Sequence, residues 1–208
     1  MTNFYLLDVT DLPDPLENKT VLSGIPDWRR TYILRYLREC DRKLSLGAWR
    51  LMEETLTKHG FSAENVIIGK NGKPECEGVY FNLSHSGDMV LCAISDAPVG
   101  CDIEKVCDAP MEVAERVFTE KERRYISGAE SDMETNHRFF KLWTTKESYM
   151  KMTGEGLSLS PDRIEINLDD LTVMRDGILQ SCTLQNSMVD GYEISVCRSK
   201  NCNIKQIT

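Results

Sequence analysis

The alternation of apolar and polar positions predicts helices in both halves of the chain. Apolar residues at helical spacing run from about Trp28 to His59, with a break near Asp41 and with Gly60 as the terminating residue. A second segment of this kind runs from Met133 to Met152 and ends at Gly154. Because each half contains helices followed by strands, the pattern indicates an α+β fold.

Short runs of apolar and β-branched residues predict the strands. Two such runs, residues 79–83 and 89–94, flank Ser86-Gly87-Asp88, which is typical of a hairpin. Thr119 and Glu122 have the spacing of a capping box, which predicts that a helix begins there. Further strands are expected at residues 4–8, 66–68, 99–106, 164–166, 181–184 and 192–197.

Composition and charge exclude several classes of protein. The 208 residues include 33 acidic and 25 basic side chains, and the formal charge of −8 argues against nucleic-acid and anionic-membrane partners. No apolar run approaches the roughly 18 residues of a membrane helix, and the first residues lack a signal-peptide pattern. We therefore expect a cytoplasmic, monomeric protein whose eight cysteines are reduced.

Two acidic residues on one expected strand form the first candidate cluster. Asp102 and Glu104 lie within Val99–Val106, where residues i and i+2 point to the same side. A hard cation relieves the repulsion between two such carboxylates, and Mg²⁺ prefers one or two carboxylates together with substrate phosphates. An ordinary solvent-facing strand explains the same spacing.

The helix over residues 133–152 contains the second candidate cluster. Trp143, Glu147 and Lys151 are spaced at i, i+4 and i+8, so they share one face of the helix. Glu147 is a third carboxylate, Lys151 is a candidate phosphate ligand one turn later, and Lys146 is a candidate for another phosphate oxygen or a partner. An amphipathic helix with a solvated Glu–Lys pair is the alternative.

The segment Asn82-Leu83-Ser84-His85-Ser86 is the third candidate cluster. A serine nucleophile with His85 as its base is one interpretation, but neighbouring residues rarely have that geometry, and the chain has no Gly-x-Ser-x-Gly elbow. A Ser–His turn that donates hydrogen bonds to phosphate oxygens is the other interpretation.

In this order and with these gaps, the three clusters resemble the motifs of the 4′-phosphopantetheinyl transferase superfamily, especially its longer, surfactin-synthetase-activating type. The resemblance rests on Phe81–Ser86, on Val99–Glu104, and on Trp143–Ser148 with its continuation to Ser158. Phe118–Glu122 and Gly72-Lys73-Pro74 match further segments of the family, so that the similarity extends from about residue 70 to residue 160.

The resemblance implies an enzyme that transfers the 4′-phosphopantetheine arm of coenzyme A to a serine of an acyl or peptidyl carrier protein. The second product is adenosine 3′,5′-bisphosphate. Carriers of fatty-acid, polyketide and non-ribosomal peptide synthesis are all compatible with the sequence, and the longer form favours those of secondary metabolism. The alternatives are a non-catalytic coenzyme A- or nucleotide-binding module of the same fold and, with less support, a Ser/His hydrolase at Ser84-His85.

The family pattern also implies roles for individual residues. Asp102, Glu104 and Glu147 are expected to bind Mg²⁺ across the pyrophosphate, and Glu147 is a candidate base for the carrier serine. Lys43 precedes Leu44-Ser45-Leu46-Gly47 and is the nearest match to the residue that grips the 3′-phosphate, with Arg42 adjacent. The expected contacts with coenzyme A come from Lys43, Gly72, Lys73, Pro74, Ser84, His85, Lys146 and Lys151.

The fold implied by the resemblance consists of two similar α/β subdomains related by a pseudo-twofold axis, with the active site in the cleft between them. A division near Pro98 separates an N-terminal subdomain (residues 1–98) from a C-terminal subdomain (residues 99–208) that carries the metal-ligand motifs. Because coenzyme A and carrier proteins are acidic, this acidic chain must gather its bases locally. We therefore expect one cleft to be lined by Lys43, Lys73, Lys146 and Lys151.

Overall fold

Helices and strands alternate along the chain in the computed structural model, which describes residues 1–69 and 72–201. The first half consists of β1 (Thr2–Asp8), α1 (Asp27–Leu34), α2 (Glu39–Lys58), β2 (Ile67–Ile68), β3 (Pro74–Glu75), β4 (Tyr80–Ser86) and β5 (Met89–Ser95). The second half consists of β6 (Val99–Lys105), α3 (Ala114–Val117), α4 (Glu120–Ser127), α5 (Asp132–Thr153), β7 (Ile164–Asn167), β8 (Thr172–Arg175), β9 (Ile178–Leu179), β10 (Cys182–Val189) and β11 (Tyr192–Ser199).

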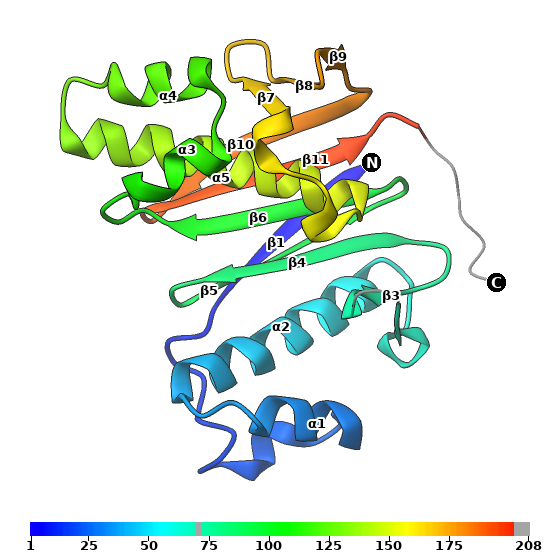
Figure 1. The fold of residues 1–208 in the computed structure, drawn as a ribbon. Helices are drawn as coiled ribbons and strands as arrows, with labels where there is room; N and C mark the ends of the chain where they lie inside the picture. The colour runs from blue at the N-terminus through cyan, green and yellow to red at the C-terminus, as the bar shows by residue number, and fades with distance from the viewer. Residues whose placement is uncertain (70–71, 202–208) are drawn as a thin grey trace.

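Two three-stranded antiparallel sheets lie at the centre of the molecule and have the same strand order. In the first sheet β5 lies between β1 and β4, and in the second sheet β11 lies between β6 and β10. In each sheet the last two strands form a hairpin, and a long helix lies in the connection between the first two strands, α2 in one and α5 in the other. Figure 1 shows α2 beside β4 and β5, and α5 beside β10 and β11.

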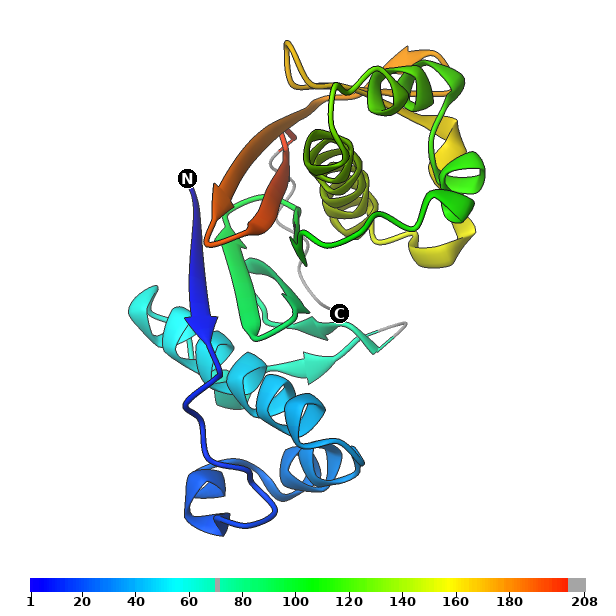
Figure 2. The same cartoon turned by 90° about the vertical axis from the view of Figure 1, so that its left-hand side faces the viewer.

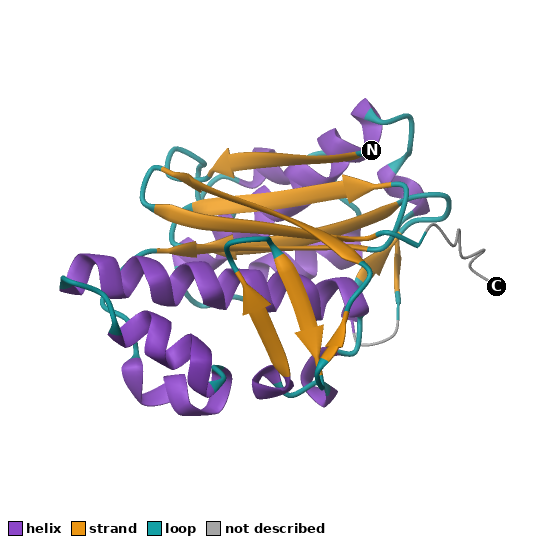
Figure 3. Ribbon diagram, turned by 90° about the horizontal axis from the view of Figure 1, so that it is seen from above, coloured by secondary structure: helices purple, strands orange, loops and turns teal. Residues whose placement is uncertain are grey.

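An apolar layer joins the inner faces of the two sheets. Leu91 and Ala93 of β5 pack in one buried cluster with Cys101 and Ile103 of β6 and with Ile194 of β11. The long helices cover the outer faces, and Figure 2 shows α5 nearly along its axis, between the β10–β11 hairpin and α3 and α4. In Figure 3 the strands of both sheets lie across the middle of the molecule with helices around them.

Local signals in the sequence explain where α4 and α5 begin and end. The predicted capping box is present at α4, since Thr119 Oγ1 accepts from the Glu122 backbone nitrogen at 3.3 Å and Glu122 Oε2 accepts from that of Thr119 at 2.8 Å. Ser131 Oγ caps α5 by accepting from the backbone nitrogen of Glu134. Gly154 ends α5 with a φ of 72°, a conformation that glycine adopts without steric cost.

The predicted α+β class is confirmed, with two differences in the elements. The helix expected from Trp28 to His59 is divided at Arg35–Arg38 rather than near Asp41. Strand β4 continues through Ser86, because every residue up to that position pairs with β5. The Ser84-His85 segment therefore lies in a strand and not in a turn.

Two further predictions concern cysteines and membranes. Seven of the eight cysteines lie in the described residues and are free thiols there, whereas Cys202 lies outside them. Within residues 1–69 and 72–201, no helix combines the length and the apolar character that crossing a bilayer requires.

Candidate active site

Helix α5 lies directly against β6 at Gly100. A Cβ atom at this position would lie 2.1 Å from the backbone oxygen of Ser148 and 2.3 Å from the backbone nitrogen of Met152. Real Cβ contacts are never this short, so only glycine allows the helix backbone to approach the strand so closely. This approach brings Lys151, near the end of α5, next to the strand that carries the two predicted carboxylates.

Asp102 lies at the centre of the candidate site. The residue is only 3% exposed, and its Oδ1 accepts hydrogen bonds from Lys151 Nζ at 2.6 Å and from Ser84 Oγ at 2.8 Å. Lys151 Nζ also donates to Ser84 Oγ at 3.0 Å, so the three side chains contact one another. Asp102 Oδ2 is buried and has no hydrogen-bond partner among the described residues. A buried acceptor of this kind is a position where a further donor or a cation is stabilised.

The other two predicted carboxylates lie at the edges of this cluster. Glu104 follows Asp102 by two residues on β6, and its Oε2 accepts a hydrogen bond of 2.7 Å from Ser86 Oγ of β4. Glu147 lies one helical turn before Lys151, and both carboxylates are half-buried. No three His, Cys, Asp or Glu side chains in the described part of the chain are already arranged as a metal site.

Burial raises the pKa of all three carboxyl groups above their ordinary values. For Asp102, burial outweighs the opposing effect of the Lys151 ammonium and the hydrogen bond from Ser84. Burial is also the largest cause of the raised pKa of Glu104 and Glu147, and the charge of Asp102 raises both pKa values further. A cation bound by these carboxylates would have the opposite effect and would lower their pKa values.

The cation of the cluster keeps its charge. Burial by itself would lower the pKa of Lys151, but the interaction with Asp102 holds it above the ordinary lysine value. Lys73 contacts the same part of α5, since its Nζ donates to the Lys151 backbone oxygen at 3.5 Å. Burial lowers the pKa of Lys73, and the charge of Lys151 adds to this effect.

The remaining predicted contacts of coenzyme A are His85 and the residues around Lys73. Loss of water around the ring lowers the pKa of His85, and the charge of Lys151 is the second cause. Gly72 has a φ of 76°, which allows the chain to turn before Lys73, and Pro74 begins β3. The structure therefore brings together Lys73, Ser84, Asp102, Glu104, Glu147 and Lys151 from β4, β6, α5 and the loop before β3, whereas the exposed His85 lies on the other side of β4 from Ser84 and Ser86.

Among the described residues, the polar contacts of Lys43 lie inside the first half. Its Nζ lies 2.8 Å from Glu39 Oε1, one helical turn earlier, and donates to the backbone oxygen of Thr10 at 3.3 Å. The neighbouring Arg42 is buried and donates to both carboxylate oxygens of Asp14. Arg42 is thus used to hold the fold, and the contact of Lys43 with a 3′-phosphate stays a prediction.

Lys146 lies elsewhere, and the expectation that it contacts a phosphate is wrong. Its side chain is 1% exposed, and its Nζ lies 2.7 Å from Glu122 Oε2. The same ammonium donates to three backbone oxygens at 2.6 to 2.9 Å, those of Val117, Pro161 and Ile164. These contacts use all of its hydrogen atoms, so Lys146 joins α5 to α4 and β7 instead of lining a cleft with Lys73 and Lys151.

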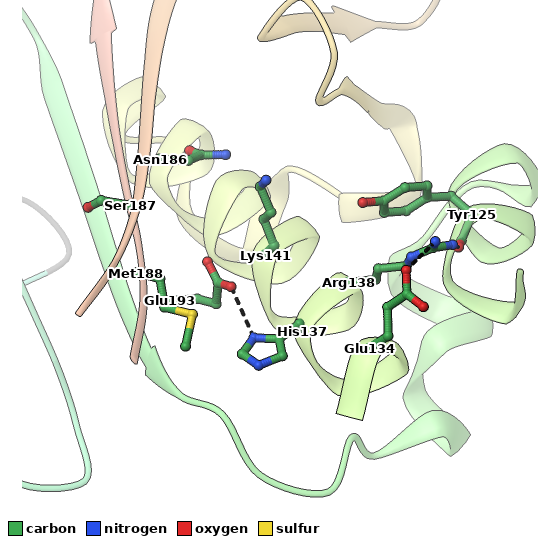
Figure 4. Close-up of a pocket in the computed structure, with 9 residues that line it drawn as sticks. All are labelled: Tyr125, Glu134, His137, Arg138, Lys141, Asn186, Ser187, Met188 and Glu193. Carbon is green, nitrogen blue, oxygen red and sulfur yellow. Dashed lines mark hydrogen bonds and ion pairs between the residues drawn. The ribbon is translucent and has the colours of Figure 1, made fainter. Parts of the chain in front are cut away.

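A pocket of about 460 Å³ lies apart from these residues, between α4, α5, β10 and β11 (Figure 4). Lys141 and His137 of α5 and Glu193 of β11 line it, and His137 Nδ1 lies 3.4 Å from Glu193 Oε1. None of the predicted site residues lines this pocket. The candidate active site is therefore the cluster around Asp102 and not this hollow.

Comparisons with known proteins show to which family the chain belongs. The profile of the 4′-phosphopantetheinyl transferase superfamily matches residues 98–197. The chain is 35% identical over 193 residues to the 4′-phosphopantetheinyl transferase Sfp of Bacillus subtilis (strain 168), and this match covers 87% of the chain and 85% of Sfp. The chain belongs to the 4′-phosphopantetheinyl transferase superfamily.

A second curated relative agrees with this family. The 4′-phosphopantetheinyl transferase gsp of Aneurinibacillus migulanus is 30% identical over 182 residues, which cover 84% of this chain and 76% of gsp. The predicted longer, surfactin-synthetase-activating type is thus confirmed, and the protein is a phosphopantetheinyl transferase. A solved holo-(acyl-carrier-protein) synthase of Bacillus anthracis, in complex with coenzyme A (3′,5′-ADP), is 22% identical with a TM-score of 0.42 over 50% of this chain and 97% of its own.

Two residues of the phosphopantetheinyl transferase motifs contribute contacts that spacing alone does not predict. Gly100 allows α5 to approach, and Ser86 holds Glu104. A signal for the second contact was present, because Ser84 and Ser86 alternate with the same period as Asp102 and Glu104. No signal within β6 indicated which helix would lie against Gly100.

Proposed function

We propose that this phosphopantetheinyl transferase moves the 4′-phosphopantetheine arm of coenzyme A to a serine hydroxyl of an acyl or peptidyl carrier protein and releases adenosine 3′,5′-bisphosphate. The observation that carries the proposal is the meeting of Asp102, Lys151 and Ser84, from three different elements, beside Glu104 and Glu147. The reaction exchanges one phosphate oxygen for another. It therefore requires positioning of the reactants and neutralisation of charge more than a covalent intermediate.

We infer that Asp102, Glu104 and Glu147 hold Mg²⁺ during the reaction. Asp102 Oδ2 is a buried acceptor without a hydrogen-bond partner in the described part of the chain, which is where a ligand oxygen is needed. Carboxylate oxygens are the ligands that Mg²⁺ prefers, together with phosphate oxygens of a substrate. When bound, the ion neutralises charge on the pyrophosphate and so stabilises the leaving group.

Lys151 is the residue of the chain that we assign to the phosphates. Its ammonium is held in the charged form by Asp102, and a charged donor binds phosphate oxygens more strongly than a neutral one. Ser84 Oγ lies within hydrogen-bond distance of the same ammonium, so a phosphate at Lys151 also meets this hydroxyl. Lys73 and His85 are proposed as further contacts of coenzyme A, with Gly72 and Pro74 shaping the turn beside it.

Glu147 is proposed to have two roles that compete. Burial raises the pKa of its carboxyl group, which strengthens it as a base for the proton of the carrier serine. Binding a cation has the opposite effect, because a positive charge stabilises the carboxylate and lowers its basicity. We assign Glu147 first as a metal ligand and second as the base, directly or through a water molecule.

The same strand order in both sheets supports a pseudo-twofold arrangement. We propose two similar subdomains, residues 1–98 and 99–208, each with one long helix on a three-stranded sheet. The cleft between them then includes the place where β4 meets β6 and the end of α5. The monomeric state and the cytoplasmic location stay predictions.

The proposal is tested by loading a carrier protein and weighing it by mass spectrometry. Wild-type protein with coenzyme A and Mg²⁺ is expected to add the phosphopantetheine arm, and Asp102→Ala, Glu104→Ala and Glu147→Ala are each expected to abolish the addition. Glu53→Ala is the matched control, because this carboxylate is exposed on α2. Normal loading by all three site variants would contradict the proposal that these carboxylates bind the metal ion.

Two further measurements separate the alternatives. Chelation of divalent ions abolishes loading if the metal mechanism holds, whereas a Ser/His hydrolase at Ser84-His85 is insensitive to chelator. Tight binding of coenzyme A in a calorimeter, without loading of fatty-acid, polyketide or non-ribosomal peptide carriers tried in parallel, would favour the non-catalytic binding module. The parallel assay also identifies the carrier class.

A further inference from the structure

Strands β4 and β6 lie side by side but belong to different sheets. Side chains of β4, instead of its backbone, satisfy backbone amides of β6. Asn82 Oδ1 accepts from the Cys101 nitrogen at 2.9 Å, and Ser86 Oγ accepts from the Lys105 nitrogen at 3.2 Å. These donors belong to the edge of β6 that β11 does not pair, and a buried amide without a partner is costly.

The same alternate positions of β4 also hold the carboxylates of β6. Ser84 Oγ donates to Asp102 Oδ1 at 2.8 Å, and Ser86 Oγ donates to Glu104 Oε2 at 2.7 Å. We call Asn82, Ser84 and Ser86 the side-chain seam. Residues 82, 84 and 86 point to the same side of β4 because side chains alternate along a strand. This side of β4 therefore contacts β6 at regular intervals.

Ser86 differs from Ser84 in the way its hydroxyl is used. Ser84 contacts Lys151 as well as Asp102, and so lies among the residues assigned to the phosphates. The Ser86 hydroxyl accepts the Lys105 N–H with a lone pair and gives its only proton to Glu104. With both contacts made, the hydroxyl restrains one carboxylate oxygen, Oε2, and leaves Oε1 of Glu104 for a cation.

We propose that Ser86 is a positioning residue for Glu104 and that the side-chain seam sets the distance between the metal-binding carboxylates. This inference rests on the proposed metal-dependent transfer. A glutamate side chain has three rotatable bonds, and fixing it before the ion arrives removes part of the entropy cost of binding. Partners of this kind, which orient metal ligands without touching the ion, typically contribute about 10-fold to 100-fold in metal affinity.

The test compares Ser86→Ala with Ser86→Thr, which keeps the hydroxyl. Mn²⁺ is titrated into each full-length protein with coenzyme A present, and free Mn²⁺ is measured by electron paramagnetic resonance. Ser86→Ala is expected to weaken binding by about 10-fold or more, and Ser86→Thr to bind like wild type. Ser199→Ala is the matched control, a half-buried serine at the end of β11 whose hydroxyl contacts no carboxylate in the described residues.

A second readout separates positioning from a general loss of structure. In the loading assay, Ser86→Ala is expected to need more Mg²⁺ for half-maximal rate, by the same factor, while the rate at saturating Mg²⁺ stays close to wild type. A lowered maximal rate at unchanged Mg²⁺ requirement would contradict the proposal. So would Mn²⁺ binding by Ser86→Ala that matches wild type, or equal weakening in the alanine and threonine variants.

Failure of this inference is distinguishable from failure of the proposed function. If the wild-type protein binds Mn²⁺ and loads a carrier while Ser86→Ala does both equally well, only the role of Ser86 is lost. If the wild-type protein loads a carrier in the presence of chelator, the metal-dependent mechanism fails and the role of Ser86 fails with it.

Discussion

The long helices α2 and α5 cover sheets of the same strand order, and both pack through apolar side chains, but α5 adds buried polar contacts with the strands beneath it. Under α2 the contacts are made by apolar side chains, among them Leu44, Ala48, Leu51, Val90 and Cys92. Under α5 the hydroxyls of Ser148 and Ser195 lie 2.9 Å apart, and Lys151 bonds Asp102. Both interfaces contribute stability through burial, and the second also places Lys151 next to Asp102, where substrates are proposed to bind.

Each long helix also carries a buried cation that joins it to a neighbouring segment. Arg42 of α2 donates to Asp14 and to the backbone oxygens of Tyr36 and Leu37. Lys146 of α5 pairs with Glu122 and donates to three backbone oxygens. The two halves therefore use one way of holding a helix in place, and only the second half adds a reactive cluster.

The largest effect on stability is expected from breaking the ion pair under α5. Lys146→Met leaves the Glu122 carboxylate buried without its partner, which should lower the free energy of unfolding by about 3–5 kcal/mol. The double variant Lys146→Met/Glu122→Gln should recover much of this loss, because neither charge is then buried alone. Guanidinium unfolding of both variants measures the difference.

The matched control for this pair is Lys121→Met. Lys121 pairs with Glu165 on the surface, and such exposed pairs contribute at most about 1 kcal/mol. An equal loss of stability in Lys121→Met and Lys146→Met would contradict the importance of burial.

The next largest difference between the two halves is expected from alanine substitutions at Gly100 and Gly47, the glycines at which each long helix approaches a neighbouring segment closely. At Gly100 a Cβ meets backbone atoms of α5 that cannot move separately, so Gly100→Ala should cost about 3 kcal/mol or more and reduce transfer strongly. At Gly47 of α2 a Cβ would lie 2.4 Å from a methyl group of the buried Val9, so one stiff side chain must move but the backbones of α2 and β1 need not. Alanine also favours a helix by about 1 kcal/mol over glycine, which offsets part of this cost, so Gly47→Ala should lower stability less than Gly100→Ala and leave transfer nearly unchanged.

Denaturant unfolding and carrier loading of both glycine variants are the measurements. If Gly100→Ala and Gly47→Ala lower stability and transfer rate by similar amounts, the close approach of α5 to β6 has no special importance for the reaction. That result would weaken the assignment of the cluster around Lys151 as the active site.

A smaller effect is expected when the polar interface under α5 is made apolar. Ser148→Ala leaves the buried Ser195 hydroxyl without this partner, which should cost about 1–3 kcal/mol. Replacing both serines by alanine removes both polar groups, so the double variant should be closer to wild type than the sum of the single variants. A double-mutant cycle by urea unfolding measures the coupling, and strict additivity would contradict it.

The last comparison concerns pH, because the pKa values of the buried aspartates of the two halves are shifted in opposite directions. The hydrogen bond from Arg42 lowers the pKa of Asp14 from 3.8 to about 2, so its stabilising contribution is complete above pH 3.8 and is lost as the pH falls toward 2. Burial raises the pKa of Asp102, so its ionisation destabilises the folded state as the pH rises above 3.8.

Asn substitutions at the two positions should therefore change the pH profile with opposite signs. Asp14→Asn should remove a rise of stability with pH below 3.8, and Asp102→Asn should remove a fall of stability above it. Unfolding free energies measured by urea between pH 2 and 7 test both expectations, and slopes that change in the same direction would contradict them.

The sequence by itself determined the features that depend on neighbouring residues. The capping box at Thr119 and Glu122, the end of α5 at Gly154 and the common side of Asp102 and Glu104 all follow from contacts or periodicity within a few positions. The order of the motifs was enough to predict the family, because these short segments are the ones that carry its chemistry.

Only the tertiary structure decided which side chains meet. Lys146 and Lys151 looked alike as lysines of one helix, but the first is turned to oxygens 15 to 29 residues away and the second to Asp102, 49 residues away. The side-chain seam and the approach of α5 to Gly100 likewise join segments that are distant in the chain. Such partners are selected by the packing of two sheets and two helices together, a collective result that no local pattern contains.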